Sequence, residues 1–245
     1  MNKFISWLFN KDRVYPQLIV ENINHPNRFY AVPLIGGLVK IIAVIPVLIV
    51  LFFVGIYLLF IDIINSFVVL FKGTYWQYAY EMNLSLMKLS LKMQFYFLGI
   101  TDRYPGFDFK VDDRFTLDIP IPQNPSRLFA LPVVGGLMRL ILIMPVGVYH
   151  YILDETSRFT VNILAWFWVL FKGRYPEWIY ELTRDSERVE LSMWAYLSGL
   201  SDEYPSLYIS MNHKTAKLVF MGLLLMLGFA GFFIPDASPN LTNSP

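Results

Sequence analysis

The sequence predicts an integral membrane protein that is mainly α-helical and consists of two tandem repeats. Hydrophobic residues make up 56% of the chain and charged residues 16%, where a soluble domain has about a quarter charged residues. Several apolar runs reach the roughly 20 residues that an α-helix needs to cross a bilayer. A seven-residue motif, Val69 to Tyr75, returns as Val169 to Tyr175.

The second half of the chain repeats the first. Between 69–105 and 169–205, 15 of 37 positions are identical, and further upstream the halves align with an offset of 99 residues. The paired positions include Tyr80/Tyr180, Gly99/Gly199, Asp102/Asp202, Gly36/Gly135 and Lys40/Arg139. Such residues at fixed spacing indicate a duplication rather than a chance similarity of apolar segments.

The repeat divides the chain into five segments. We expect a basic, interfacial lead at 1–14, a first membrane repeat at 15–112, a second at 113–211, a C-terminal transmembrane helix at 212–235 and a polar tail at 236–245. Each repeat should contain a strand, a membrane helical hairpin, an interfacial amphipathic helix and a further strand, in that order.

Each long apolar run is predicted to form a helical hairpin. Residues 39–70 would measure about 48 Å as one helix, against a hydrocarbon core of about 30 Å. Charged residues interrupt the second run at 154–158, and the repeat places 54–58 at the same position in the first run. We therefore expect apices at 54–58 and 154–158, with arms that either cross the bilayer or re-enter it.

The distribution of basic residues predicts the orientation. Of 20 Lys and Arg residues, only Arg158 falls at a predicted apex, and none follows Lys217. By the positive-inside rule, the N-terminus lies in the cytoplasm and the C-terminus outside, in a multi-pass protein of the bacterial cytoplasmic (inner) membrane. A single span in place of each hairpin is the alternative, and it would put Lys72 and Arg103 on the far side.

Amphipathic helices and short strands should follow the hairpins. Apolar residues recur at three-four spacing from Ala79 to Tyr96 and from Ile179 to Tyr196, and a glycine follows each stretch. These helices would lie along the membrane surface or pack on their own hairpins. Alternating segments at 17–21, 107–111, 115–121 and 207–211 predict four strands of a small cytoplasmic antiparallel sheet.

One stretch carries a family resemblance. Phe171 to Pro176, with a Trp-rich apolar arm before it and Ser201 to Pro205 after it, resembles an uncharacterised bacterial membrane-protein domain, a domain of unknown function. The resemblance covers 15–110 and 115–211 and so implies two tandem copies of a Phe-x-Gly-Arg-Tyr-Pro and Asp-x-Tyr-Pro motif. The first copy departs from this motif at Thr74 and Trp76. The resemblance implies a bacterial membrane origin and an accessory role, and no activity.

Polar residues in apolar segments are the first candidate site. Asp62 is the one acid inside an apolar arm, Asn65 lies on the same helical face, and Asn162 is the counterpart of Asp62 in the second repeat. An ionisable residue inside a membrane is a functional candidate by default. A hydrogen bond between helices, a position near the head groups and an ion or proton path all remain open.

Residues at the cytoplasmic membrane boundary are the second candidate site. A lipid head group or a protein partner could be held by Lys72, Tyr75, Lys172, Arg174 and Tyr175. The alternative is that the lysines extend to the membrane surface and the tyrosines belong to the aromatic belt.

Composition and spacing exclude several classes of function. There is no cysteine, and the three histidines have no metal-ligand spacing, so we expect no metal and no cofactor. A net charge of +1 gives no support for a nucleic-acid partner. We therefore expect a non-enzymatic accessory or scaffold subunit of a larger bacterial membrane assembly, with membrane lipid and protein as partners. Lipid binding, transport or scrambling is the second hypothesis, and a small-solute or ion transporter is the third.

Overall fold

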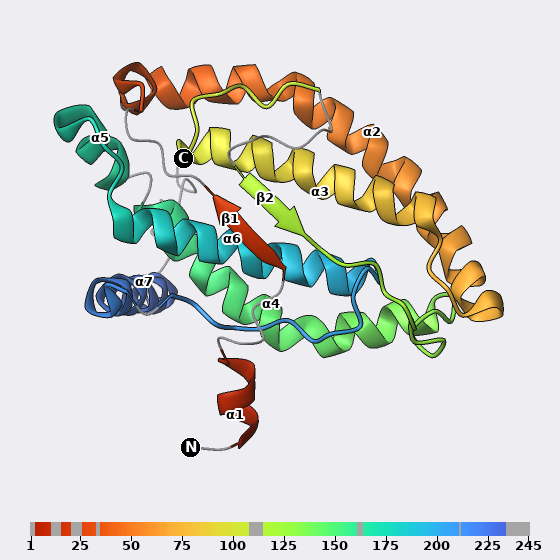
Figure 1. Ribbon diagram of the computed structural model, residues 1–245. Helices are drawn as coiled ribbons and strands as arrows, with labels where there is room; N and C mark the ends of the chain where they lie inside the picture. The colour runs from red at the N-terminus through yellow and green to blue at the C-terminus, as the bar shows by residue number, and fades with distance from the viewer. Residues whose placement is uncertain are drawn as a thin grey trace, which may run out of the picture.

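The computed structural model is mostly helical, with one small sheet (Figure 1). It describes residues 3–10, 16–20, 26–32, 35–107, 115–160, 164–210 and 212–233. In chain order the elements are α1 (Lys3–Leu8), β1 (Gln17–Val20), η2 (Arg28–Ala31), α2 (Ile35–Lys72), α3 (Gln77–Leu98), β2 (Phe115–Asp118), α4 (Val134–Thr160), α5 (Trp166–Lys172), α6 (Glu177–Leu197) and α7 (Lys214–Phe233).

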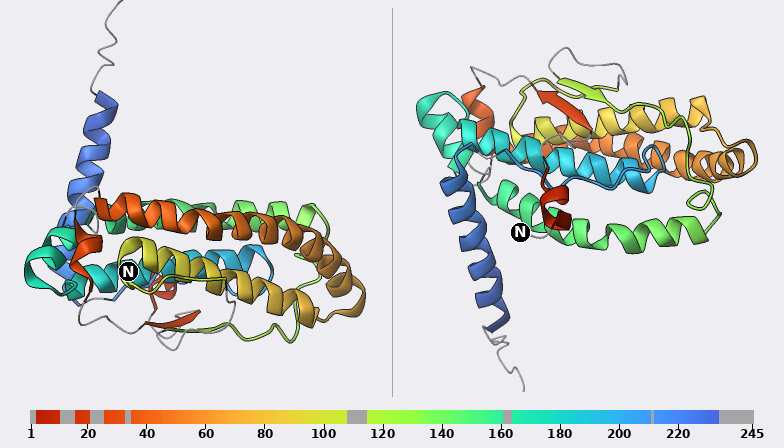
Figure 2. Two further views of the ribbon diagram at one scale, coloured as in Figure 1. Left: turned by 90° about the horizontal axis from the view of Figure 1, so that it is seen from above. Right: turned by 60° about the horizontal axis from the view of Figure 1, so that its bottom comes forward.

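The elements form three layers. The strands β1 and β2 lie in front in Figure 1, α3 and α6 run behind them, and α2 and α4 form the rear layer, as the view from above in Figure 2 shows. Helix α2 packs on α3, and α4 packs on α6. Helix α7 leaves the molecule on the side of α2 and α4 and runs transverse to both of them (Figure 2).

The hairpin predicted in the first repeat is wrong. Helix α2 continues without a break from Ile35 to Lys72, so 54–58 lies in its interior and not at an apex. Of these five residues only Gly55 is a weak helix former, and a glycine inside a helix costs about 1 kcal/mol. Such a cost does not end a helix of 38 residues whose inner face packs along α3.

The apex predicted at 154–158 is wrong for a different reason. The charged residues there belong to α4, which continues to Thr160. Asp154 and Arg158 form an ion pair of 2.8 Å one helical turn apart, and Ser157 bonds to Thr183 of α6 at 2.8 Å. These polar residues are satisfied within α4 and across to α6, so they do not need a turn exposed to water.

The predicted sheet is present with two strands. Strand β1 pairs with β2 in antiparallel register, with Leu18 opposite Leu117. Of the other two predicted strands, 108–111 lies outside the described residues, and 207–210 is not a strand. The backbone of 207–210 is held instead by polar groups: Arg188 donates to the carbonyl of Tyr208, and the amide of Ser210 donates to Asp185 at 2.5 Å.

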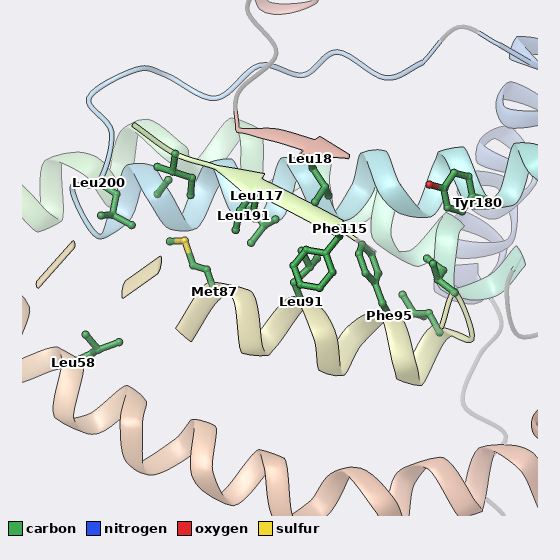
Figure 3. Close-up of a cluster of buried hydrophobic side chains, with 14 of the residues drawn as sticks. Leu18, Leu58, Met87, Leu91, Phe95, Phe115, Leu117, Tyr180, Leu191 and Leu200 are labelled. Carbon is green, nitrogen blue, oxygen red and sulfur yellow. The ribbon is translucent and has the colours of Figure 1, made fainter. Parts of the chain in front are cut away.

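The main hydrophobic core lies between α3, α6 and the strand pair. In Figure 3, Leu18 and Leu117 of the strands point toward Leu91 and Phe95 of α3 and Leu191 of α6. Phe95 also meets Phe115 edge to face, with ring centroids 6.1 Å apart. A second, smaller core joins α4, α6 and the segment around Leu207. The amphipathic helices therefore pack inward, as one of the two sequence-based alternatives expected.

Several contacts between the two halves come in matched pairs. The hydroxyl of Tyr80 donates to the carbonyl of Ile119, and that of Tyr180 donates to the carbonyl of Val20. The hydroxyl of Tyr75 donates to Ser198 at 3.2 Å, and that of Tyr175 donates to Leu98 at 3.5 Å. Each member of a pair reaches from one half of the chain into the other.

Candidate functional site

One candidate site is a groove between α2, α3 and α6. We call it the α2–α3–α6 groove; its volume is about 580 Å³, within the range of small-molecule sites. Most of its wall is apolar. The polar side chains that line it are Asp62, Asn83, Ser90, Gln94, Glu190 and Ser198. Phe52 and Leu59 of α2, which are 63% and 65% exposed, form its outer edge, so the groove opens on the same side as the exposed face of α2.

Asp62, the acid singled out in the sequence, lies in this groove. Asn83 of α3 donates a hydrogen bond of 2.7 Å from its side-chain amide to Asp62 Oδ1. This is the inter-helix hydrogen bond that the sequence left open as one alternative. Asn65 is buried on the same helix and accepts a bond of 2.9 Å from the amide of Trp76, which fixes the start of α3. Asn162 lies outside the described residues.

A second carboxylate lines the opposite wall of the groove. Gln94 of α3 donates to Glu190 Oε1 at 3.1 Å, which joins α3 to α6 across the two halves. The other oxygen of Glu190 lies 3.9 Å from Nε2 of His150 on α4. The groove therefore carries a carboxylate on α2 and another on α6, each bonded to a neutral amide of α3.

Next to the groove, the interface between α4 and α6 buries an ionisable cluster. Glu187 of α6 is 3% exposed, and its Oε2 has no hydrogen-bond partner. Burial raises the pKa of Glu187 well above its usual range, the nearby charges of Glu190 and Asp154 raise it further, and Arg158 opposes them. Glu187 therefore keeps its proton at a pH at which an exposed glutamate is ionised.

A buried cation supports each half, Lys40 in the first and Arg139 in the second, and the sequence analysis gave neither a role. Lys40, 1% exposed, lies between the rings of Tyr30 and Tyr96, at 5.4 and 5.5 Å from their centroids. Its counterpart Arg139 lies between Phe129 and Tyr196 at 4.8 and 4.9 Å. Cations in such positions interact with the ring faces. The signal in the sequence was that both apolar runs have a basic residue at the same position of the repeat.

The aspartates of the two Asp-x-Tyr-Pro motifs form hydrogen bonds to residues that are distant in the sequence. Asp102 accepts a hydrogen bond from the amide of Asn27, and Asp202 accepts one of 2.6 Å from the amide of Ser126. Asp202 also pairs with Arg139. These aspartates therefore fix the chain just before each long apolar helix.

The residues predicted at the membrane boundary divide into two groups. Lys72, Lys172 and Arg174 are exposed. Tyr75 and Tyr175 are buried, at 7% and 6% exposure, and burial raises the pKa of both hydroxyls. The sequence had suggested that these tyrosines could touch a lipid head group. Their hydroxyls instead bond to backbone carbonyls in the other half, so they are not positioned to do so.

Lys172 borders a second cavity of about 350 Å³. Side chains of α5, α6 and α7 line it, among them Trp168, Trp178 and Phe220. Trp178 and Phe220 stack with centroids 5.1 Å apart and so join α7 to α6. Within the ranges that the structure describes, no group of three or more His, Asp or Glu residues is arranged to hold a metal ion.

Comparison with known proteins identifies one part of the chain. No curated protein and no solved structure matches the chain. Two helices among the described residues, α2 and Val134–Arg158 of α4, are long and apolar enough to cross a membrane. Residues 135–207, which comprise most of α4, all of α5 and α6 and the start of the extended segment after α6, match the model of a domain of unknown function, DUF4389.

Proposed function

We propose that the protein is a non-enzymatic accessory or scaffold subunit of a bacterial inner-membrane assembly, with the α2–α4 layer in contact with lipid. The observation that carries this proposal is the position of the exposed apolar side chains. On α2 they include Ile42, Ile49, Phe53 and Phe60, and on α4 they include Leu137, Ile141, Met144 and Val148. Soluble proteins rarely expose apolar surface of this extent, which is typical of a membrane or protein interface.

In this proposal α2 and α4 lie along the membrane and α7 crosses it. At 1.5 Å per residue, α2 measures about 57 Å, nearly twice the hydrocarbon thickness of about 30 Å. Helix α7 extends from the α2–α4 side and runs transverse to both helices, so the three cannot all stand upright in one bilayer (Figure 2). The strand pair and the basic residues of the connecting segments then face the cytoplasm, by the positive-inside rule.

The two halves are proposed to be tandem copies that associate like the subunits of a dimer. The matched tyrosine bonds and the register of β1 with β2 support this, because each contact has a counterpart with the roles of the halves exchanged. The symmetry axis runs through the strand pair. In Figure 1 the strand pair is seen face on and α7 nearly end on, so α7 runs roughly parallel to this axis, to one side of it.

Co-purification tests the scaffold role. The protein is extracted from its own membrane in polymer discs, and we expect a second protein at constant stoichiometry. Replacing Phe53 and Phe60 by Ala should reduce the amount of this partner, because a partner in the same bilayer would replace lipid on part of the exposed face of α2, where both side chains lie. Thr116→Ala on the exposed face of β2 is the control. A protein that purifies alone, and whose deletion changes the level of no other membrane protein, contradicts the proposal.

Lipid handling is a second candidate function, and the α2–α3–α6 groove favours it. The groove is mainly apolar, contains two carboxylates and opens on the exposed side of α2, which is the proposed lipid side. A long in-plane helix also perturbs the leaflet in which it lies. In liposomes that contain the purified protein, we expect faster exchange of a fluorescent lipid between leaflets. An exchange rate equal to that of protein-free liposomes contradicts this role.

A further inference from the structure

We infer that the α2–α3–α6 groove binds a membrane amphiphile with a hydrocarbon tail and a protonated amine head group. This deepens the lipid-handling candidate by naming the chemical class of its ligand, and it rests on the proposed contact between α2 and lipid. The inference depends on three features of the groove: its apolar wall, its two carboxylates and the absence of Lys and Arg from the described residues that line it.

The apolar wall of the groove would contact the hydrocarbon tail of the ligand. Leu51, Leu58 and Leu59 of α2 face Leu86 and Met87 of α3 across the groove. The exposed edge at Phe52 and Leu59 allows a chain to enter from the proposed lipid side without crossing water. A volume of about 580 Å³ is sufficient for a single-chain amphiphile, since ligand sites of this kind range from about 300 to 1,000 Å³.

The carboxylates determine the head group. Asp62 and Glu190 line the groove, and no Lys or Arg is among the described residues that line it. The amides of Asn83 and Gln94 donate one hydrogen bond to each carboxylate, but an amide does not neutralise a charge. A carboxylate removed from water is stabilised by a cation that can also donate hydrogen bonds, and a protonated amine does both.

The second half of the chain supports this reading by contrast. Position 158 carries Arg158, whose Nε lies 2.8 Å from Asp154, whereas the equivalent position of the first half carries Leu58. The first half lacks both members of this pair, since Val54 and Leu58 stand at these positions. Asp62 has the apolar Leu58 four residues before it on α2, so a ligand is expected to bring the positive charge.

The same charges argue against an acidic ligand. A fatty acid or a phosphate head group would bring a negative charge close to Asp62 or to Glu190, and like charges at short distance are unfavourable in a region of low dielectric constant. An uncharged amphiphile would fill the apolar wall but gain nothing from the carboxylates. The predicted order of affinity is therefore amine, then alcohol, then carboxylate, at equal chain length.

A titration with three probes tests the inference. Because the chain has no cysteine, Leu197→Cys at the groove can carry one environment-sensitive fluorophore. The full-length protein in discs of zwitterionic lipid is titrated with dodecylamine, dodecanol and dodecanoate. We expect dodecylamine to bind at least 10-fold more tightly than dodecanol. Asp62→Asn should remove this preference and leave dodecanol unchanged, and the natural Asn162 occupies the equivalent position of the second half.

Two further variants sharpen the test. Leu59→Lys places a cation at the exposed edge of the groove and should also abolish the amine preference, whereas Asp118→Asn on β2, away from the groove, should have no effect. Equal affinities for the three probes, no binding of any probe, or a preference that survives Asp62→Asn would overturn the inference. The depth of α2 in the bilayer is measured separately, so that failure of the membrane placement is distinguished from failure of the head-group assignment.

Discussion

Leu18 of β1 lies opposite Leu117 of β2, and the two residues occupy the same position in halves of the chain that are offset by 99 residues. Their neighbours are exchanged about this pair, since Gln17 faces Asp118 and Ile19 faces Thr116. The register therefore has two-fold symmetry. An arrangement of this kind is typical of the interface in a symmetric dimer.

The tyrosine hydroxyls that reach across this interface should stabilise it. Tyr180→Phe removes the bond to Val20, and Tyr80→Phe removes the bond to Ile119. A hydrogen bond of this kind contributes about 1 kcal/mol, and we expect a similar loss from each variant. Hydrogen exchange at the amides of β1 and β2 should become faster in both. Tyr151→Phe, at an exposed position of α4, is the control, and equal exchange in all three variants would contradict the assignment.

Two glycines, Gly73 after α2 and Gly173 after α5, lie close to arginines of the other half. Gly173 has a φ of +66°, and a Cβ added there would lie 2.9 Å from Nη2 of Arg28; Gly73 has the same relationship to Arg127. Gly173→Ala and Gly73→Ala should each cost about 2 kcal/mol, from left-handed backbone strain and displaced arginine. Thermal unfolding measures the loss. Gly55→Ala, with no atom near its added Cβ, should be neutral or stabilising, and three equal shifts would contradict this account.

The sequence predicted the elements whose signal is local. The three-four spacing of apolar residues indicated α3 and α6, and the alternation around Leu18 and Leu117 indicated the strand pair. It could not predict that α2 and α4 continue through their expected apices. In α4 part of the relevant information lies in α6, because Ser157 bonds to Thr183 across the interface. The rest is local, since Asp154 and Arg158 pair one helical turn apart within α4.

The candidate site could be predicted only in part for the same reason. Asp62 was identified because an acid inside an apolar run is conspicuous in a sequence. Glu190, which lines the same groove, lies in a polar helix and had no such contrast. The burial of Tyr75 and Tyr175 depends on carbonyls of Ser198 and Leu98, which are far away in the chain and carry no side-chain signal.

Glu187 should make the protein less stable as the pH rises. Because burial and two neighbouring acids raise its folded-state pKa, the folded protein holds a proton that the unfolded chain releases above the usual pKa of a glutamate. The free energy of unfolding then falls with rising pH until the raised pKa is passed, by about 1.4 kcal/mol for each unit of the shift. Glu187→Gln should remove this decline.

Thermal unfolding at several pH values tests this prediction. The melting temperature of Glu187→Gln should exceed that of the wild type by more at pH 8 than at pH 5. Glu203→Gln, at an exposed position, serves as the control and should follow the wild type. Parallel curves for the wild type and Glu187→Gln would mean that Glu187 is ionised in both the folded and the unfolded state.

The attachment of α7 should depend on the ionised form of Glu181. Lys217 of α7, 1% exposed, donates to Glu181 at 2.9 Å, and Asn212 donates to the other carboxylate oxygen at 2.9 Å. Burial raises the pKa of Glu181, but these bonds and the charge of Lys217 outweigh it, and the pKa ends below its usual range. The stabilisation is therefore present above the usual pKa of a glutamate and is lost as the pH falls through the lowered value.

Glu181→Gln should loosen α7 at neutral pH, because it leaves the charge of Lys217 buried without its partner, at a cost of about 3 kcal/mol. The measurement is the rate at which a short bismaleimide joins cysteines placed at Trp178 and Phe220, which stack in the wild type. The rate should fall in Glu181→Gln relative to the double-cysteine protein that keeps Glu181. Glu177→Gln, one turn earlier on α6, should leave it unchanged; equal rates in all variants would show that other contacts hold α7.

The depth of α2 in the bilayer is the most direct test of the central claim. Single cysteines at Ile42, Phe53, Phe60 and Phe71 carry spin labels, and electron paramagnetic resonance measures their accessibility to oxygen and to a water-soluble nickel complex. All four side chains are exposed, and the first and last are about 44 Å apart along the helix. If α2 lies along the membrane, all four labels are accessible to oxygen, protected from nickel and at similar depth. Nickel accessibility at both 42 and 71 with the greatest depth between them, as a single span requires, or at 53 alone, as a hairpin that crosses the bilayer requires, would contradict the account.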